Sequence, residues 1–318
     1  MVEVLEAGGL VTVQDGGRSG WRSFGVPASG PMDLFAFRAA NILVGNPPDT
    51  AALEFGGGDL VLRPAYDCVI AVAGVGYNLS VAIWDISPWS SCFVRGGSTI
   101  SLRRSGFGMW SYLTLAGGIE VPPVLRSRST YLRGHFGGLD GRLLQAGDVL
   151  RSGRAKTPLM EMAARTLAHD ARPAYTESPT VEVIAGPQAE YFAPDCMESF
   201  LSNPYKVSPS SDRMGYRLEG SRLTQHNRAE LTSEGLTAGA IQVPADGQPI
   251  VMMADFATAG GYPKIATVIS ADLPLLAQCT PGKDEVRFKQ TTIEAAQAKY
   301  RQMMHKLNTG IVIDENEN

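Results

Sequence analysis

Short apolar runs separated by glycine and proline constrain the fold of this sequence most strongly. The 318 residues include 35 glycines and 20 prolines. In the first half, β-branched and aromatic residues form runs bounded by Gly, Pro or Asp, which is the pattern of short strands joined by tight turns. These runs are Asp59–Arg63, Cys68–Ala73, Ser98–Arg103 and Met109–Leu115. We therefore expect the first half to be rich in β-structure.

One helix is expected among these strands, and another near the end of the chain. In Gly30-Pro31-Met32-Asp33 the proline suits the first helical position and the Asp33 carboxylate suits the first turn. Apolar residues follow at helical spacing until Gly45-Asn46-Pro47-Pro48 ends the helix. A terminal helix is expected from Thr291, where Thr291 and Glu294 form a capping-box pattern before an apolar stripe.

The chain divides at a change in composition. From 151 to 179 the strand pattern gives way to Ala, Pro, Arg and Thr, so we expect a linker with one short helix at Leu159–Ala168. Strand-like runs resume at Val181–Ala185, Ala240–Val243, Pro249–Ala254 and Ile265–Ile269. We predict a β-rich half at 1–150, a linker at 151–179, a barrel half at 180–290, and a C-terminal helix and polar tail at 291–318. The expected class is mostly β, α+β, with barrel-like sheets.

Charge and apolar content argue against nucleic-acid and membrane partners. The net charge is −4 with no Lys/Arg cluster, and the longest apolar run, near Val69–Val75, is too short to span a bilayer. The start MVEVLEAGGL lacks the basic and apolar regions of a signal peptide, so a cytoplasmic location is expected. Buried free thiols are then the favoured interpretation of the scattered cysteines Cys68, Cys92, Cys196 and Cys279.

Several common catalytic motifs are missing from the sequence. It contains no GxxxxGK[ST], GxSxG or HExxH, so we expect no Walker-type ATP site, no serine-hydrolase elbow and no zinc site in this chain. Gly74 and Gly76 fit a turn better than a dinucleotide site. The histidines are far apart and share no spacing; they are His135, His169, His226 and His305.

Two polar, glycine-containing segments could bind a carboxylate. In Thr12–Arg18, flexible backbone beside Gln14 and Arg18 could offer N–H donors and a positive charge, although a hairpin with a surface ion pair is the plainer alternative. In 208–217, Asp212 beside Arg213 could orient a guanidinium toward a carboxylate or carbamate. Alternatively, Asp212 forms an Asx turn and Arg213 is a strut between sheets.

Two further segments could act on an amide. Gln242 and Gln248 lie beside a predicted strand and could hydrogen-bond an amide group, or simply face solvent. In 254–264, a strand ends in Asp255 and continues to Gly260-Gly261, whose N–H groups could stabilise an oxyanion. An ordinary strand-to-turn junction is the alternative. The residues Thr258 and Tyr262 flank these glycines.

Read in order, these segments resemble the family of the 5-oxoprolinase C subunit, also called allophanate hydrolase subunit 2 or the biotin-dependent carboxyltransferase family. The similar stretches run from Thr12 to about Pro274 and cover most of the chain. They are TVQDGGRSGWRSFGVPASGPMD, ANILVGNPPDTAALE, LAGGIEVPPVLRSRSTYLRGHFGGLDGR, VSPSSDRMGYRLEG, GAIQVPADGQPIVMMAD and GGYPKIATVISADLP.

The resemblance implies a cyclophilin-like β-barrel, an additional β-rich N-terminal half, and a companion 5-oxoprolinase subunit of the B type. It implies that the complex uses ATP to open the lactam of 5-oxoproline to glutamate. One alternative is the carboxyltransferase half of a biotin-dependent urea-type carboxylase, although this chain has no AMKM-like biotinylation site. Another is a regulatory antagonist of a kinase-inhibitor partner.

Within these motifs we assign hypothetical roles to the candidate residues. Asp255 would be the base or polarising carboxylate, with Gly260 and Gly261 as backbone donors. Arg213 and Arg18 would bind a substrate carboxylate, and Gln242 and Gln248 would orient the amide. The remaining substrate-binding candidates are Gln14, Asp212, Thr258 and Tyr262. The sequence departs from the family pattern at Phe256-Ala257-Thr258-Ala259, Gly16 and Trp21, which leaves the substrate open.

Overall fold

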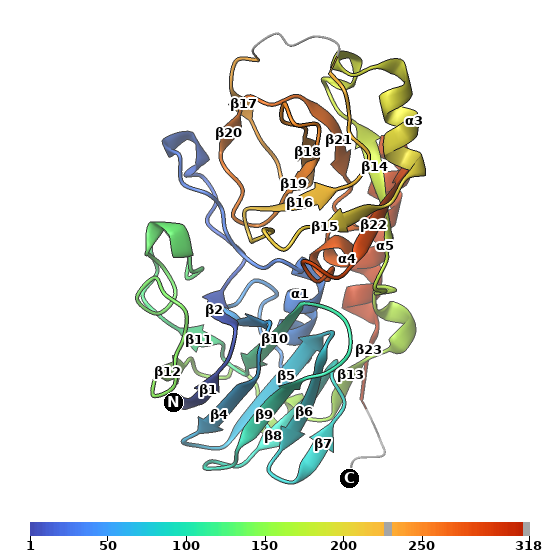
Figure 1. Cartoon of the computed structure of the whole chain (residues 1–318). Coiled ribbons are helices and arrows are strands. Elements are labelled where there is room, and N and C mark those ends of the chain that lie inside the picture. Colours follow the sequence, from blue (N-terminus) through green and yellow to red (C-terminus); the bar gives the residue numbers. More distant parts are fainter. Residues whose placement is uncertain (226–230, 314–318) are drawn as a thin grey trace. The chain divides into compact units, whose positions relative to one another are not determined.

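The computed structural model describes residues 1–225 and 231–313, so His226 and the predicted tail Asp314–Asn318 lie outside the described residues. The chain forms two compact units (Figure 1). Unit 1 comprises Met1–Ser19, Ser29–Pro173 and His305–Asn318, and unit 2 comprises Gly20–Ala28 and Ala174–Met304. Unit 2 therefore takes nine residues from a segment that interrupts unit 1 in the sequence.

Unit 1 contains two sheets, each seven-stranded over the residues described. In hydrogen-bonded order, the first consists of β11 (Ile119–Glu120), β12 (Val149–Ser152), β1 (Val2–Ala7), β4 (Leu60–Pro64), β9 (Ile100–Arg104), β6 (Tyr77–Val81) and β7 (Trp84–Ile86). The second consists of β2 (Leu10–Gln14), β3 (Ala52–Gly56), β10 (Trp110–Leu115), β5 (Cys68–Gly74), β8 (Ser90–Val94), β13 (Arg165–Leu167) and β23 (Ile311–Ile313). The predicted strands of the first half are confirmed to within about two residues at each end.

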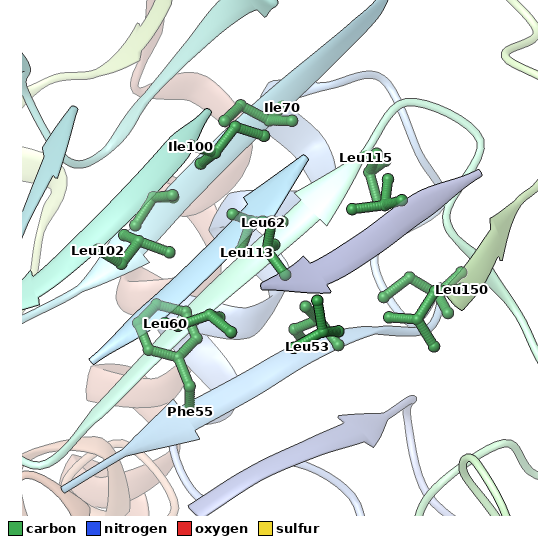
Figure 2. Close-up of a cluster of buried hydrophobic side chains, with 14 of the residues drawn as sticks. Leu53, Phe55, Leu60, Leu62, Ile70, Ile100, Leu102, Leu113, Leu115 and Leu150 are labelled. Atoms are coloured by element: carbon green, nitrogen blue, oxygen red, sulfur yellow. The ribbon is translucent and has the colours of Figure 1, made fainter. Parts of the chain in front are cut away.

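The core of unit 1 follows from period-two alternation in these strands. Leu60 and Leu62 on β4, like Ile100 and Leu102 on β9, are fully buried on one side of their sheet. They belong to one apolar cluster with side chains of the second sheet, and Figure 2 shows leucines of both sheets in this cluster. The other labelled side chains in that figure are Leu53, Phe55, Ile70, Leu113, Leu115 and Leu150.

Helix α1 (Leu34–Leu43) covers the opposite face of the second sheet. It starts later than predicted, because Asp33 is its N-cap: the Asp33 carboxylate accepts a hydrogen bond from the Ala36 N–H. The Tyr112 hydroxyl donates to Glu54 Oε2 and accepts from the Asp33 N–H. Because all three side chains are completely buried, this network sets where the helix meets the sheet. Burial also raises the pKa of Tyr112 well above 10.0, so its hydroxyl stays a donor.

The segment 151–179, predicted as a linker, carries regular elements. A helical turn α2 (Leu159–Met162) is followed by Ala164 at φ 56°, and β13 then pairs with β8 and β23. The left-handed residue explains why the predicted helix Leu159–Ala168 stops early. A 3-10 turn, η3 (His169–Ala171), comes next. These residues complete the second sheet of unit 1.

Unit 2 is built around a closed barrel, which confirms the prediction of a mostly β fold with a barrel. Its strands in order are β14 (Thr180–Ala185), β21 (Lys264–Val268), β18 (Ala240–Gln242), β19 (Ile250–Met252), β16 (Gly215–Glu219), β15 (Tyr205–Val207) and β22 (Glu285–Gln290). Neighbouring strands are antiparallel except β14 and β22, which pair in parallel and close the barrel. A small separate sheet joins β17 (Glu234–Gly235) to β20 (Ala259–Gly260).

Helices and 3-10 turns complete the barrel unit. They are η1 (Arg22–Phe24), η4 (Ala189–Tyr191), α3 (Pro194–Ser202), α4 (Leu273–Ala277) and α5 (Ile293–Thr309). Helix α5 begins after the predicted Thr291, because the Thr291 N–H still pairs with Val183 O while Thr292 Oγ1 accepts from the Ala295 N–H. No helix among the described residues is long and apolar enough to cross a membrane.

An ion cluster attaches α5 to the barrel. The Lys299 ammonium lies 2.8 Å from Asp272 Oδ1 and 3.0 Å from Glu182 Oε2. Asp272 is completely buried, and its other oxygen accepts the Glu182 N–H. Burial lowers the pKa of Lys299, but hydrogen bonds to Asp272 and Glu182 outweigh it and raise that pKa above 10.5. Lys299 therefore stays charged throughout the neutral range.

We expect Lys299→Met to destabilise the protein by about 1–2 kcal/mol, a value that allows for solvent around this half-exposed lysine. Because the folded pKa is raised, the contribution is complete below pH 10.5 and is lost as the pH rises through the folded value. Urea unfolding at pH 7 and pH 11 measures both effects. Lys289→Met is the matched control, since Lys289 lies 3.8 Å from the same Glu182 and is largely exposed. Equal losses for the two variants would contradict this role.

Candidate functional site

The small sheet β17–β20 brings the predicted glycines beside a carboxylate and a buried lysine. Glu234 is opposite Gly260 in this pairing. The Lys264 ammonium, at the start of β21, donates to Glu234 Oε2 over 2.6 Å, and Gln188 Nε2 donates to the same oxygen over 3.1 Å. Lys264 is buried, whereas the Glu234 side chain is half-exposed. The lysine therefore places its positive charge on the side chain of the residue that pairs with Gly260, at the end of the glycine loop (residues 256–262), and meets solvent through Glu234.

Gln242 lies against the same loop from the barrel side. Its side chain is buried, and Nε2 donates to the Tyr262 carbonyl over 3.2 Å. A Cβ at Gly260 would lie 2.7 Å from this Nε2, so glycine lets the loop lie this close without displacing the Gln242 amide. The structure thus brings together the predicted Gln242, Gly260 and Tyr262. The amide of Gln242 holds the loop from the side of the barrel, through the Tyr262 carbonyl.

Asp255 and Arg213 form a buried ion pair. Arg213 Nε lies 2.9 Å from Asp255 Oδ2, and Nη2 lies 3.3 Å from Oδ1. Both side chains are at most 7% exposed. The Asp255 N–H also donates to the Arg213 carbonyl over 2.7 Å. The sequence suggests that these residues act on substrate separately, but in the structure they bind each other and fix the entry to 256–262.

Other predicted residues stabilise turns. Asp212 accepts the N–H groups of Met214 and Gly215 and so forms an Asx turn. Gln248 pairs through both amide atoms with the backbone of Gly220. The carbonyl of Thr258 accepts from the Leu236 N–H. These contacts support the loops around the barrel.

Gln14 and Arg18 belong to unit 1, where both are completely buried. Gln14 Nε2 donates to Thr12 Oγ1 and to the Thr130 carbonyl. Arg18 donates to the carbonyls of Val124 and Ser129. The alternative of a surface ion pair at Arg18 is wrong, because these backbone carbonyls surround the guanidinium and hold it inside unit 1.

An open cavity of about 530 Å³ lies next to the glycine loop. Gly261 and the half-exposed Tyr262 line one side, and Arg222 with Asp246 lines another. Arg222 is exposed, unlike Arg213 and Arg18. The remaining lining residues are Leu223, Thr224, Gln225, Leu231, Ala245, Gly247 and Pro263. A guanidinium, a phenol and backbone groups therefore meet around a space of small-ligand size.

The segment Gly20–Ala28, which belongs to unit 2, also contacts the small sheet region. Arg22 Nη2 donates to the carbonyl of Leu236, and the guanidinium lies 4.6 Å from the centre of the Phe256 ring. Phe256 and Leu236 lie in one apolar cluster with Ala240 and Met252. Arg22 therefore contacts the residue that follows β17 and a residue that precedes β20.

Sequence reasoning missed Lys264, Glu234, Gln188, Arg22 and Arg222. Lys264 carried the clearest signal, since a single lysine begins the otherwise apolar strand KIATV. Glu234 and Gln188 had no such signal, because they approach Lys264 only through long-range contacts. Within the described ranges, no three His, Cys, Asp or Glu side chains are grouped to hold a metal ion.

The contact between Lys264 and Glu234 predicts a pH-dependent contribution to stability. Hydrogen bonds from Lys264 and Gln188 lower the pKa of Glu234 below 4.5, so the contribution is complete above pH 4.5 and is lost as the pH falls through the lowered value. The difference in Tm between the native chain and Lys264→Met should therefore change between pH 6 and about pH 3. Lys206→Met, at an exposed lysine of β15, is the control. A difference that stays constant with pH would rule out the ion pair.

Comparison with known proteins agrees with the resemblance seen in the sequence. The chain is 40% identical to the 5-oxoprolinase C subunit of Escherichia coli (strain K12), over 93% of each protein. It is 31% identical to urea amidolyase of Saccharomyces cerevisiae, over 93% of this chain but 17% of that protein. The crystal structure of the K. lactis urea amidolyase superposes with a TM-score of 0.88 at 29% identity, covering 96% of this chain and 20% of that one.

The family model described as carboxyltransferase domain, subdomain A and B, matches residues 24–290. That range contains the barrel, the small sheet and the cavity. With this match and the identity to the 5-oxoprolinase C subunit, the chain belongs to the carboxyltransferase-domain family that includes that protein.

Proposed function

We propose that this chain is one component of an ATP-dependent 5-oxoprolinase complex, which opens the lactam of 5-oxoproline to glutamate. The observation that carries the proposal is the 40% identity to the 5-oxoprolinase C subunit over 93% of both chains. A companion 5-oxoprolinase subunit of the B type completes the complex. ATP acts at the level of the complex, since the sequence has no Walker-type motif.

The reaction adds water to the lactam carbonyl, breaks the C–N bond and protonates the ring nitrogen. The developing oxyanion needs preorganised donors, and one such donor is typically worth about 3 kcal/mol of barrier. We assign this role to the N–H group of Gly261, because Gly260 already pairs with Glu234 in the small sheet. Lys264, bonded to the side chain of Glu234 opposite Gly260, adds a positive charge, and Gln242 holds the loop through the Tyr262 carbonyl.

The buried ion pair favours a positioning role for Asp255. Both of its carboxylate oxygens bind Arg213, so Asp255 holds the loop that carries Thr258, Gly260 and Gly261. Asp255 then acts on the lactam indirectly, by positioning the loop and by the electrostatic field of its carboxylate. This is the polarising role, not that of a base. Glu234 is the half-exposed carboxylate of the cluster and is our candidate for proton transfer.

Arg222 is the arginine best placed to bind the substrate carboxylate. Arg213 is engaged with Asp255, and Arg18 lies inside unit 1. Arg222 instead lines the open cavity beside Gly261 and Tyr262. A guanidinium can bind a carboxylate through two parallel hydrogen bonds, and Tyr262 can pack against the lactam ring.

We expect Arg222→Met to raise KM for 5-oxoproline by at least about tenfold, because a charge-assisted pair is worth about 1.5–3 kcal/mol. The assay is ATP hydrolysis dependent on 5-oxoproline, with the chain reconstituted with its companion subunits. Arg217→Met is the matched control, at an exposed arginine on β16, and should leave KM unchanged. If the native complex hydrolyses no ATP in response to 5-oxoproline, the proposed function is wrong. If the native complex is active and Arg222→Met has the same KM for 5-oxoproline, the proposed function stands but the role of Arg222 is wrong.

A carboxyltransferase is the second candidate function, favoured by the matched family model and by the superposition on urea amidolyase. In that reaction an amide-type nitrogen receives a carboxyl group from carboxybiotin on a partner protein. A donor-rich loop beside a buried lysine could serve this chemistry too, because it also forms a charged oxygen. Turnover that requires bicarbonate and a biotinylated partner, without 5-oxoproline, would decide for it.

A further inference from the structure

The cavity beside the glycine loop is bounded by three backbone segments in a fixed order. The middle segment, 243–247, accepts a hydrogen bond from the Leu223 N–H and donates one to the Pro263 carbonyl, each over 3.0 Å. The segments that carry Arg222 and Gly261 therefore lie on either side of it. All three segments contribute residues to the cavity.

Each segment brings a different polar group to the cavity. Arg222 offers a guanidinium, and the backbone of Gly261 offers an N–H donor. Asp246, on the middle segment, offers a carboxylate, which only accepts hydrogen bonds. Across the cavity the order of the groups is thus a cation, an acceptor and a donor.

The turn at Asp246 accounts for only one of its two carboxylate oxygens. Oδ1 accepts the Gln248 N–H over 3.0 Å, which is the contact of an Asx turn. Within residues 1–225 and 231–313, Oδ2 accepts no hydrogen bond, and the exposed Asp246 forms no ion pair with Arg222. An asparagine would stabilise the same turn. The second oxygen is therefore available to a ligand in the cavity.

The ring of 5-oxoproline presents complementary groups in the same order. Its N–H lies between the carbon that bears the carboxylate and the carbonyl carbon. Arg222 can bind the carboxylate, Asp246 can accept the N–H, and the Gly261 N–H can bind the carbonyl oxygen. The positive charge of Arg222, on the neighbouring segment, also offsets the repulsion between Asp246 and the substrate carboxylate.

We propose that Asp246 selects a cyclic amide over the corresponding cyclic ester, by accepting the lactam N–H through Oδ2. An ester oxygen at that ring position would set its lone pairs against the carboxylate, which has no donor to offer. The inference rests on the proposed function for the substrate and adds a specificity-determining residue to it. The substrate class is then a lactam with a free N–H and a carboxylate on the carbon next to nitrogen.

The test compares 5-oxoproline with two analogues, in which the ring N–H is replaced by oxygen (the lactone) or by CH2 (the cyclopentanone). Dissociation constants are measured by calorimetric titration of the reconstituted complex, with a non-hydrolysable ATP analogue present so that no ring is opened. The native complex should bind 5-oxoproline at least about tenfold more tightly than either analogue, because a site built to accept an N–H rejects a ligand that lacks it.

Asp246→Asn should change these preferences in a characteristic way. Its Oδ1 keeps the contact with Gln248, so an NH2 donor replaces the free acceptor at the cavity. We expect 5-oxoproline to bind at least about tenfold more weakly and the lactone more tightly, with little change for the cyclopentanone. Asp67→Asn is the matched control, at an exposed aspartate of unit 1 whose Oδ1 accepts the Gly96 N–H, and should leave all three constants unchanged.

Each result decides the inference. If the native complex binds the lactone as tightly as 5-oxoproline, no acceptor recognises the N–H and the inference is wrong. An equal loss of affinity for all three compounds in Asp246→Asn would indicate a structural role, which also overturns it. If the native complex hydrolyses ATP with 5-oxoproline while Asp246→Asn keeps the native preferences, the proposed function stands and the role of Asp246 is wrong. If the native complex neither binds 5-oxoproline nor hydrolyses ATP with it, the proposed function is wrong and the inference falls with it.

Discussion

The buried pair of Arg213 and Asp255 is the constraint on which the candidate site depends. Neither charge could remain buried without the other, since removing one partner of such a pair leaves an uncompensated charge. The pair joins the turn before β16 to the end of β19, and the chain then enters the glycine loop. Because Asp255 immediately precedes the glycine loop, the pair fixes where that loop starts. A side chain without direct contact to substrate can thus control the geometry of the site.

Local patterns in the sequence were sufficient for the strands but not for the contacts between them. Apolar alternation and glycine punctuation located β4, β5, β10 and β14, because these features depend on residues close in sequence. The start of α1 was misplaced, because Asp33 is the N-cap and not a first-turn residue, and its N–H bonds to Tyr112 on a strand far along the chain. Likewise, nothing near residues 151–179 indicates that β13 pairs with the last described residues.

The same distinction explains the outcome for the charged residues. Arg18 and Arg213 are of a residue type that often binds ligands. In the fold, however, Arg18 donates to the carbonyls of Val124 and Ser129, and Arg213 binds the Asp255 carboxylate. Lys264 interrupts a mostly apolar strand, but a lysine at a strand end usually faces solvent, so this signal alone does not mark a site residue. The side chains that could act on a ligand are those that long-range packing leaves beside the cavity, and that packing is set by the pairing of distant strands.

The parallel pairing of β14 and β22 has a consequence for biosynthesis. These strands lie at the two ends of the barrel segment, with Thr180 opposite Arg287, so the barrel cannot close before nearly the whole chain has left the ribosome. The second sheet of unit 1 likewise gains its edge strand β23 only at the end of synthesis, since β13 pairs with Ile311–Ile313. Until then, the open edges of β13 and β14 are exposed to other nascent chains. Rapid completion of translation, or a chaperone that shields those edges, would limit such contacts.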